Sequence, residues 1–161
     1  MAMPEPEPYM LPDIVELNRL MAASFLRLVG RRLVAEAGTL TPAGLAKTLY
    51  EAPFVLLAHT NAPDPVFCYA NRRAQELFGY GWDEFTRLPS RLSAEPVSRQ
   101  EREQLLNQAR RKGYVENAAG IRVSRDGRRF RIENVILWDV SDDGGTFVGQ
   151  AAVYDRWTEL T

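Results

Sequence analysis

Three aspartates lie close together in the sequence and are the first candidates for chemistry: Asp139, Asp142 and Asp143. Two or three carboxylates in one place can bind a metal ion or share a proton. Asp142 and Asp143 are followed directly by Gly144-Gly145, however, and this order is typical of a turn, which explains the acids without an activity. The sequence contains no P-loop, dinucleotide-binding fingerprint or catalytic-triad spacing. We therefore expect a protein that is not an enzyme.

The chain has one cysteine, Cys68, and one histidine, His59. These counts exclude an internal disulfide and argue against a metal site built from cysteine and histidine. Cys68 falls in a predicted strand, where a free cysteine is most often a small buried hydrophobe. His59 ends another predicted strand beside a turn, where we expect a surface or strand-end residue rather than a haem or metal ligand. The sequence predicts no metal and leaves the cofactor unknown.

Composition and charge are those of an ordinary folded chain. Of the 161 residues, 45% are apolar and 25% are charged, and the formal net charge is -1. A chain of this length buries enough surface for one domain with an appendage. A net charge near zero produces no field that would attract nucleic acid or an anionic membrane. No apolar run approaches 18 residues and the N-terminus lacks a signal-peptide pattern, so we expect a cytoplasmic protein without nucleic-acid or membrane partners.

The N-terminal third is predicted to be a tail and a helical extension. Prolines and glutamates near the start predict that residues 1–12 form a mobile tail. Apolar residues then recur at three- and four-residue steps over residues 13–37, which predicts an amphipathic helix with Asp13 as its cap and a bend or division at Gly30. A second short helix completes an extension over residues 13–52. The apolar stripe of the first helix is expected to pack either on the rest of the fold or against a second copy in a dimer.

Three capping signals mark further helix starts. Thr41-Pro42 places a hydroxyl before a proline at the first helical position. Asn71 offers its side-chain oxygen to the free backbone N–H groups of the helix that follows it, and Gly79 is free to take the left-handed conformation that ends this helix. Ser98 and Glu101 have the spacing of a capping box. These signals predict a short second helix in the extension and several more helices in the middle of the chain.

Strand patterns occur in five segments, residues 53–60, 66–70, 115–124, 128–140 and 146–157. Asp126-Gly127 between two of them is a two-residue hairpin signal, because both central positions of a type I′ turn need positive φ. The helices are segregated between the first two strands and the last three. This order predicts an α+β fold with one five-stranded antiparallel sheet, small helices on one of its faces and the N-terminal helical extension.

Residues 128–140 alternate between apolar and charged side chains. The alternation predicts that one face of this strand carries Phe130, Ile132, Asn134, Ile136 and Trp138. A buried amide needs hydrogen-bond partners, so Asn134 is either a pocket amide that meets a ligand or an amide tied to backbone. A bulge would turn Glu133 toward the pocket instead. The facing of Arg122 and Gln150 on neighbouring strands stays open, because an error of one residue reverses a period-two assignment.

The stretch YANRRAQELFGY, residues 69–80, resembles the segment of PAS domains in which the second strand turns into the first small helix. More specifically, YANRRAQELFGYGWDEFTRLPSRLSAEPVSRQER, GIRVSRDGRRFRIENVILWDV and GQAAVYDRW resemble the MEKHLA family of PAS-like domains, over about residues 40–157. The resemblance implies a PAS-like domain over residues 53–157, often enclosing a pocket. It also implies a sensory or protein-interaction module of the stand-alone bacterial type.

The sequence lacks the motifs with which PAS domains hold flavin or haem. Some PAS domains hold a flavin that reacts with the cysteine of a GxNCRFLQ-type motif, and this motif is absent. Haem-binding PAS domains usually need an axial histidine in a pocket helix, and the predicted helix over residues 99–112 has none. The resemblance therefore leaves the ligand undefined.

We expect a PAS-like sensory or small-ligand-binding module that signals through a homodimer or a separate output protein. The alternative is a ligand-free protein-interaction or dimerisation domain. Arg91 either neutralises an acidic ligand or pairs with Glu95. The candidate pocket residues are Phe78, Trp82, Arg91, Asn134, Ile136 and Trp138.

Overall fold

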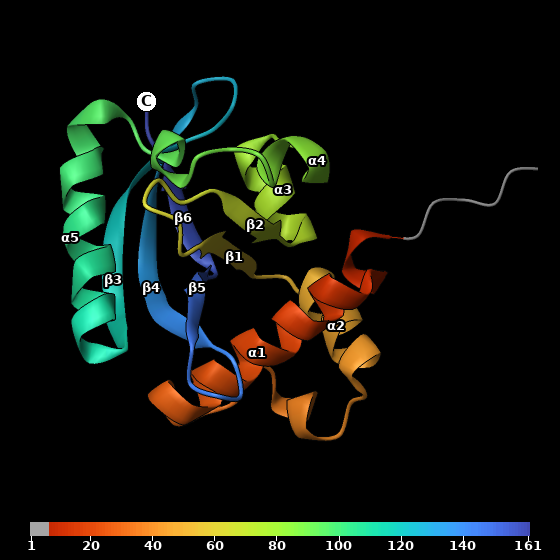
Figure 1. Ribbon diagram of the computed structural model, residues 1–161. Coiled ribbons are helices and arrows are strands. Elements are labelled where there is room, and N and C mark those ends of the chain that lie inside the picture. The colour runs from red at the N-terminus through yellow and green to blue at the C-terminus, as the bar shows by residue number, and fades with distance from the viewer. Residues whose placement is uncertain (1–6) are drawn as a thin grey trace, which may run out of the picture.

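The computed structural model describes residues 7–161, and its centre is one antiparallel sheet with helices on both faces (Figure 1). Five strands lie in the order β2-β1-β5-β4-β3, and a short sixth strand, β6, pairs with β4. The strands are β1 Val55–Thr60, β2 Phe67–Ala70, β3 Tyr114–Val123, β4 Arg129–Ser141, β5 Phe147–Tyr154 and β6 Arg156–Glu159. The predicted α+β fold is confirmed. The sixth strand arises because the last predicted strand bends at Asp155 and then continues along the start of β4.

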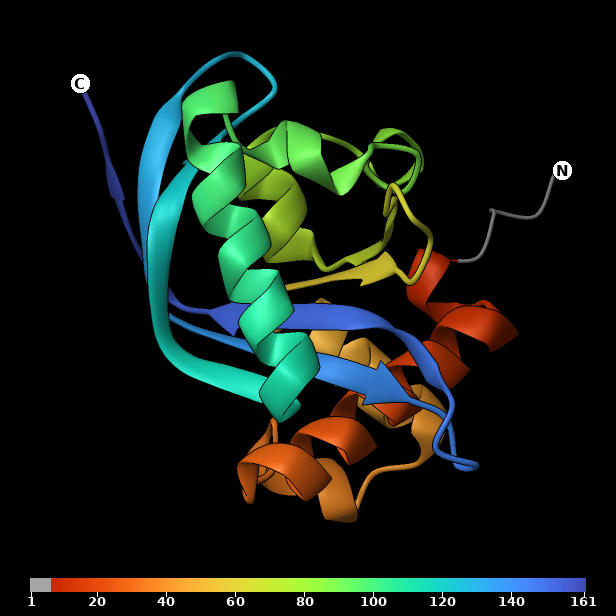
Figure 2. The same ribbon diagram turned by 60° about the vertical axis from the view of Figure 1, so that its left-hand side comes forward.

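The helices divide between the two faces of the sheet (Figure 2). We call the face that packs against α3, α4 and α5 the inner face, and the face that packs against α1 and α2 the outer face. The helices are α1 Pro12–Val29, α2 Pro42–Tyr50, α3 Arg72–Phe78, α4 Trp82–Phe85 and α5 Pro96–Lys112, with 3-10 turns η1 Pro8–Met10, η2 Ala35–Gly38 and η3 Ser90–Ser93. No helix within residues 7–161 has the length and apolar character needed to cross a membrane.

Two predicted caps and one predicted stop are confirmed. The Oγ1 atom of Thr41 accepts a hydrogen bond from the backbone N–H of Gly44 at 3.1 Å and starts α2. The Oδ1 atom of Asn71 accepts from the backbone N–H of Ala74 at 3.1 Å and starts α3. Gly79 ends α3 with φ of 78°, a left-handed conformation that costs glycine little.

Two other predicted helix starts are wrong, and a proline explains both. Helix α1 begins at Pro12, so Asp13 lies inside its first turn and does not cap it. Helix α5 begins at Pro96, so Ser98 lies inside the helix and the predicted capping box does not form. Proline suits the first helical position because it has no N–H to satisfy there. Helix α1 ends at Gly30, where the sequence predicted a bend or division.

The hairpin between β3 and β4 has a longer loop than predicted. The backbone N–H of Ser124 donates to the carbonyl of Arg128 at 2.9 Å, which leaves three residues in the loop. Gly127 has φ of 87°, whereas Asp126 is not among the described residues with positive φ, so the turn is not type I′. The geometry is that of a type I turn followed by a left-handed glycine, which also closes a hairpin without splaying its strands.

Strand β4 changes phase at its middle. Asn134 has φ of 53°, and the two-residue alternation is interrupted there. Before it Ile132 faces the inner side of the sheet, and after it Leu137 does, while Ile136 and Trp138 face the outer side. The prediction that alternating residues from Phe130 to Trp138 share one face is therefore wrong. The physical reason is the left-handed residue, which asparagine tolerates better than most residues.

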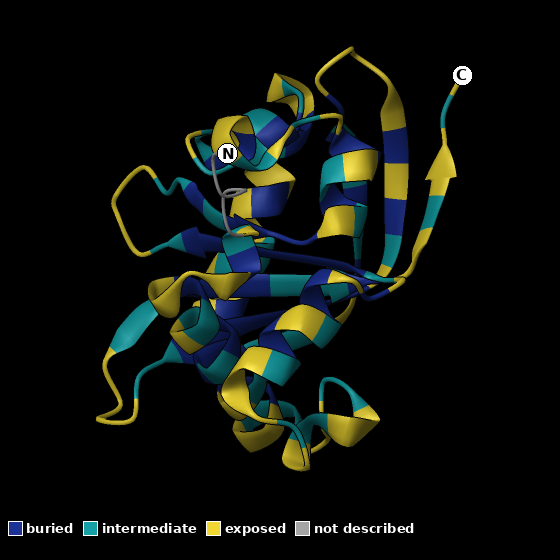
Figure 3. Cartoon of the chain, turned by 90° about the vertical axis from the view of Figure 1, so that its right-hand side faces the viewer, coloured by how far each residue is buried: buried dark blue, intermediate teal, exposed yellow. Residues whose placement is uncertain are grey.

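Helix α1 packs its apolar stripe on the outer face, which decides between the two expected arrangements. Met21 and Phe25 are 0% and 2% exposed, and the ring of Phe25 lies edge-on to Trp138 with centroids 4.8 Å apart. The indole Nε1 of Trp138 donates to the carbonyl of Met21 at 3.1 Å. Each fully buried side chain of this size contributes about 1.5–3 kcal/mol. Figure 3 shows that the exposed residues of α1 lie on the side away from the sheet.

The predicted tail is only partly described. Its first six residues lie outside the described part of the chain. Tyr9, in the 3-10 turn before α1, is buried and packs against Tyr50 of α2 with ring centroids 4.8 Å apart.

Candidate functional site

A cavity, which we call the inner cavity, lies between the inner face of the sheet and helices α3 and α5. Its volume is about 50 Å³. An ordered water needs roughly 10–15 Å³ by this measure, so the cavity has room for about four waters or a very small ligand. Its apolar wall consists of Leu57, Phe67, Phe78, Leu106, Ile132, Val135, Leu137 and the alanines of β5. Its polar wall consists of His59, Ser93, Arg102, Arg122, Gln150 and Tyr154.

Two arginines of the polar wall are buried. Arg102 on α5 is 8% exposed and Arg122 on β3 is 9% exposed. Within residues 7–161 neither forms an ion pair, and the one hydrogen bond from these two guanidiniums runs from Nη1 of Arg122 to the carbonyl of Ile121 at 2.8 Å. Burial, followed by the charge of Arg122, lowers the pKa of Arg102 to about 10, and burial lowers that of Arg122. Both remain cations at neutral pH without a carboxylate beside them.

Local sequence explains why both arginines turn inward. Arg102, Leu106 and Ala109 recur at four- and three-residue steps and so lie on one face of α5, which packs on the sheet. Arg122 lies two residues after Gly120 on β3, and a Cβ added at Gly120 would lie 2.8 Å from Nη1 of Arg122. The missing side chain of Gly120 therefore makes the space in which the Arg122 guanidinium lies back along the strand.

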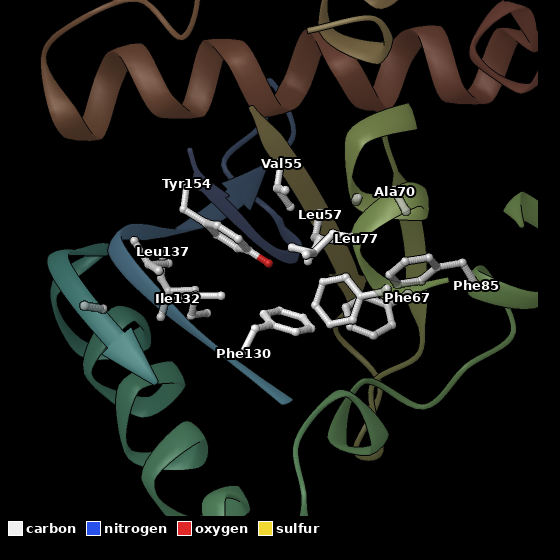
Figure 4. Close-up of a cluster of buried hydrophobic side chains, with 14 of the residues drawn as sticks. Val55, Leu57, Phe67, Ala70, Leu77, Phe85, Phe130, Ile132, Leu137 and Tyr154 are labelled. Atoms are coloured by element: carbon white, nitrogen blue, oxygen red, sulfur yellow. The ribbon is translucent and has the colours of Figure 1, made fainter. Parts of the chain in front are cut away.

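Two further polar groups of the cavity wall lack partners among the described residues: the hydroxyl of Tyr154 and the Nε2 atom of His59. Figure 4 shows the Tyr154 hydroxyl pointing into the inner cluster, toward the rings of Phe67 and Phe130. Burial raises the pKa of Tyr154, so its O–H is kept as a donor. His59 Nδ1 lies 2.9 Å from the carbonyl of Thr60, which makes Nδ1 the protonated nitrogen and Nε2 an acceptor. Burial lowers the pKa of His59 to about 4, so the ring is neutral at pH 7.

Gln150 connects the cavity wall to an ion pair between the buried Asp139 and the exposed Arg110. Its Nε2 atom donates to the carbonyl of Leu106 at 3.0 Å and to Oδ1 of Asp139 at 3.1 Å. Asp139 also accepts from Arg110, whose guanidinium lies 3.6 Å from the centre of the Phe147 ring. Burial raises the pKa of Asp139. These bonds fix α5 to strands β4 and β5 beside the cavity.

Among the predicted pocket residues, Phe78 alone lines the inner cavity. It packs edge-on against Phe130 with ring centroids 5.1 Å apart. Trp82 lies elsewhere, against the rings of Tyr50 and Tyr69 at 6.4 and 5.7 Å. Ring packing at the start of α4, rather than a cavity, therefore occupies the Trp82 side chain.

The three predicted pocket residues of β4 do not reach the inner cavity. Asn134 is exposed at the phase change of the strand, and Ile136 and Trp138 pack on the outer face. Asn134 and Ile136 instead border a more open outer groove of about 330 Å³ near the end of α1. Asn134 is therefore not the buried amide that the alternation predicted, because its left-handed backbone turns the side chain out of the predicted face.

Arg91 is exposed and pairs with Asp64, whose Oδ1 atom lies 3.2 Å from Nε of Arg91. The predicted alternative partner, Glu95, pairs with Arg129 instead. Arg91 does not line the inner cavity. The cations of the cavity are Arg102, for which no role was predicted, and Arg122, whose facing the period-two pattern left open.

The two residues with redox or metal-binding chemistry lie apart. Cys68 belongs to the outer cluster, and burial raises the pKa of its thiol to about 11, so the thiol stays protonated at neutral pH. His59 lies near the end of β1, as one of the two predicted alternatives has it, and it is 7% exposed and faces the cavity, so the other alternative, a surface position, is wrong. Residues 7–161 contain no cluster of three or more metal-binding side chains.

Comparisons with known proteins agree with this architecture. A family model described as the MEKHLA domain matches residues 15–159. The PAS domain of a protein from Colwellia psychrerythraea is similar over 72% of this chain and 93% of its own, with a TM-score of 0.60 and 14% identity. A light-oxygen-voltage domain studied with a flavin analogue is similar over 73% of this chain and 84% of its own, with a TM-score of 0.57 and 18% identity.

An RNA-binding light-oxygen-voltage receptor has a TM-score of 0.61 at 21% identity, over 81% of this chain and 36% of that receptor. A search of the curated proteins gives no match. Identities this low establish a shared fold and no more, so the ligand and partner of this chain have to be argued from its own residues.

Proposed function

Because the chain belongs to the MEKHLA domain family, we propose that it is a PAS-like sensory module that binds a small ligand in the inner cavity. The observation that carries the proposal is the polar wall of that cavity. Two buried guanidiniums and the unpartnered hydroxyl of Tyr154 line a space with room for a small molecule. Burying such groups without partners costs free energy, and a ligand that supplies partners recovers it.

A flavin, whose analogue was used to study one of the similar domains, does not fit these residues. A ligand pocket for a molecule of drug size has a volume of roughly 300–1,000 Å³, whereas the inner cavity has about 50 Å³. Cys68, the one cysteine available to a flavin, belongs to the cluster on the opposite face of the sheet. The proposed ligand is therefore much smaller than a nucleotide cofactor.

Helix α5 is the proposed route for the signal. It contributes Arg102 and Leu106 to the cavity wall, and Arg110 and the carbonyl of Leu106 join it to the sheet. A ligand that binds Arg102 shifts the equilibrium between arrangements of α5 on the sheet. We propose that a second copy of the chain or a separate output protein reads this shift, that the module itself is not an enzyme, and that it acts in the cytoplasm.

A ligand-free interaction domain is the second candidate. The observation that favours it is the small cavity volume, which leaves most of the inner core filled. Among residues 7–161, four large apolar side chains are also exposed, and they offer contact surface to a partner: Met10, Leu11, Leu26 and Val97.

Ligand screening of the purified chain separates the two candidates. Native mass spectrometry detects a retained small molecule, and a thermal-shift screen with neutral, cationic and anionic metabolites detects an added one. The variant Ala152→Leu fills the cavity, because Ala152 lies between Leu57 and Leu137 on its wall. The sensor proposal expects a shift in the parent protein that is lost in Ala152→Leu and kept in the exposed control Ala43→Leu. No retained mass and no shift with any compound would favour the interaction domain.

A further inference from the structure

We infer that the ligand of the inner cavity is a short aliphatic monocarboxylate of about three to five heavy atoms, held by the guanidiniums of Arg102 and Arg122. The inference rests on the proposed function and names the chemical class of its ligand. It is argued from the charge of the cavity, from its size and from the hydroxyl of Tyr154, which has no partner among the described residues.

The charge of the cavity calls for an anion. Arg102 and Arg122 are both more than nine-tenths buried, and neither pairs with a carboxylate within residues 7–161. The acids that act on them, Glu103 for Arg102 and Glu101 for Arg122, are exposed on α5. Two neighbouring cations in a low-dielectric site repel each other, and an anion between them removes the repulsion.

A carboxylate suits this pair better than other anions. Guanidinium groups bind carboxylates through two parallel N–H···O bonds, and these two arginines use a single N–H between them within the described residues. The rest of the wall is aliphatic and aromatic, so one end of the ligand has to be apolar. Inorganic phosphate presents oxygen on every side and would leave part of its surface against this apolar wall.

The volume limits the length of the chain. The inner cavity, at about 50 Å³, has room for about four waters, which suits acetate or propionate and leaves no room for the second carboxylate of succinate. The hydroxyl of Tyr154, which has no partner among the described residues, supplies a donor for a carboxylate oxygen.

The test measures binding of sodium acetate and sodium propionate to the full chain by isothermal titration and thermal shift, against sodium chloride at equal ionic strength. Acetamide and propionamide serve as neutral ligands of the same shape. The variants are Arg102→Met, Arg122→Met and Tyr154→Phe, and Arg111→Met is the control, an exposed arginine of the same helix as Arg102.

We expect the carboxylates to bind and the amides not to bind. Either buried-arginine variant weakens carboxylate binding by about tenfold or more, the effect of losing a charge-assisted pair. In the absence of ligand these variants melt no lower than the parent, because methionine relieves a buried unpaired charge. Arg111→Met leaves both properties unchanged. Tyr154→Phe removes one hydroxyl that has no partner among the described residues, and it also weakens carboxylate binding. This variant keeps the fold and provides the test if an arginine variant does not fold.

Equal binding of amide and carboxylate, or undiminished binding in Arg122→Met and Tyr154→Phe, would overturn the carboxylate inference. Failure of the underlying function gives a different result. If a neutral or cationic compound binds and Ala152→Leu abolishes it, the sensor proposal stands and the carboxylate class is wrong. If no compound binds and no mass is retained, both are wrong.

Discussion

Replacing Asn71 with alanine removes four hydrogen bonds from a side chain that is 0% exposed. Oδ1 accepts from the backbone N–H groups of Leu56 and Ala74, both at 3.1 Å. Nδ2 donates to the carbonyls of Leu49 and Phe54, at 3.1 and 2.8 Å. One amide therefore joins the end of α2, the start of β1 and the start of α3.

The expected loss is larger than that of an ordinary helix cap. Removing a cap costs about 1 kcal/mol. The variant also leaves one more buried N–H and two carbonyls without their partner, at about 1 kcal/mol each when taken at the low end of the range. We expect Asn71→Ala to lower the free energy of unfolding by about 3–4 kcal/mol, which corresponds to a fall in Tm of about 6–16 °C for a chain of this size.

Urea denaturation followed by circular dichroism measures this loss. The matched control is Thr41→Ala, which removes one cap hydrogen bond and is expected to cost about 1 kcal/mol. Asn71→Asp keeps the acceptor but loses both donors, so its stability should fall between the parent and Asn71→Ala. If Asn71→Ala costs no more than Thr41→Ala, the bonds to β1 and α2 contribute nothing and the reasoning fails.

Three other perturbations test the buried histidine, the phase change in β4 and the docking of α1. Folding lowers the pKa of His59 from 6.5 to about 4, so between these pH values the unfolded state binds a proton that the folded state does not bind. The free energy of unfolding is therefore highest above pH 6.5 and falls by up to about 3 kcal/mol as the pH falls toward 4. Between pH 7 and pH 5, the free energy of unfolding measured in urea should fall less in His59→Asn than in the parent. An equal fall would contradict the lowered pKa of His59. Asn134→Val should lower stability by about 1–2 kcal/mol because of its left-handed φ, whereas Asn134→Gly should not, and equal Tm values would refute the role of φ. Trp138→Phe loses the bond to the Met21 carbonyl, at a cost of about 1–2 kcal/mol, and should speed hydrogen exchange in α1 more than in α5; unchanged exchange in α1 would exclude this bond as its anchor.

Local signals predicted most of the fold. Asn71 and Thr41 were recognised as caps from their residue type, and Gly79 as a helix stop, because each acts within a few residues of its own position. The two proline starts were missed because a capping-box sequence and an aspartate offered competing signals nearby. The backbone conformation of one turn decides which residue starts the helix, and residue types alone do not fix that conformation.

The candidate site was predicted poorly because its residues depend on tertiary contacts. Asn134 was placed in the pocket by a period of two, although asparagine is one of the residues enriched at left-handed positions. Arg102 carried no prediction, although its spacing to Leu106 and Ala109 places it on the apolar face of α5. That spacing was the available signal. Gly120, which makes room for Arg122, gives no such signal before the strand pairing is known.

The left-handed residue in β4 shifts the alternation of side chains along the strand by one residue. Before Asn134 the even-numbered residues of β4 face the inner side of the sheet, and after it the odd-numbered residues do. Ile132 and Leu137 therefore lie on the same side although their positions differ by an odd number. Deleting that single residue would restore one regular two-residue alternation along β4. The separation of Ile132 and Leu137 would then be even, so a regular pleat would keep Leu137 on the wall of the inner cavity and Trp138 against α1 without any left-handed residue.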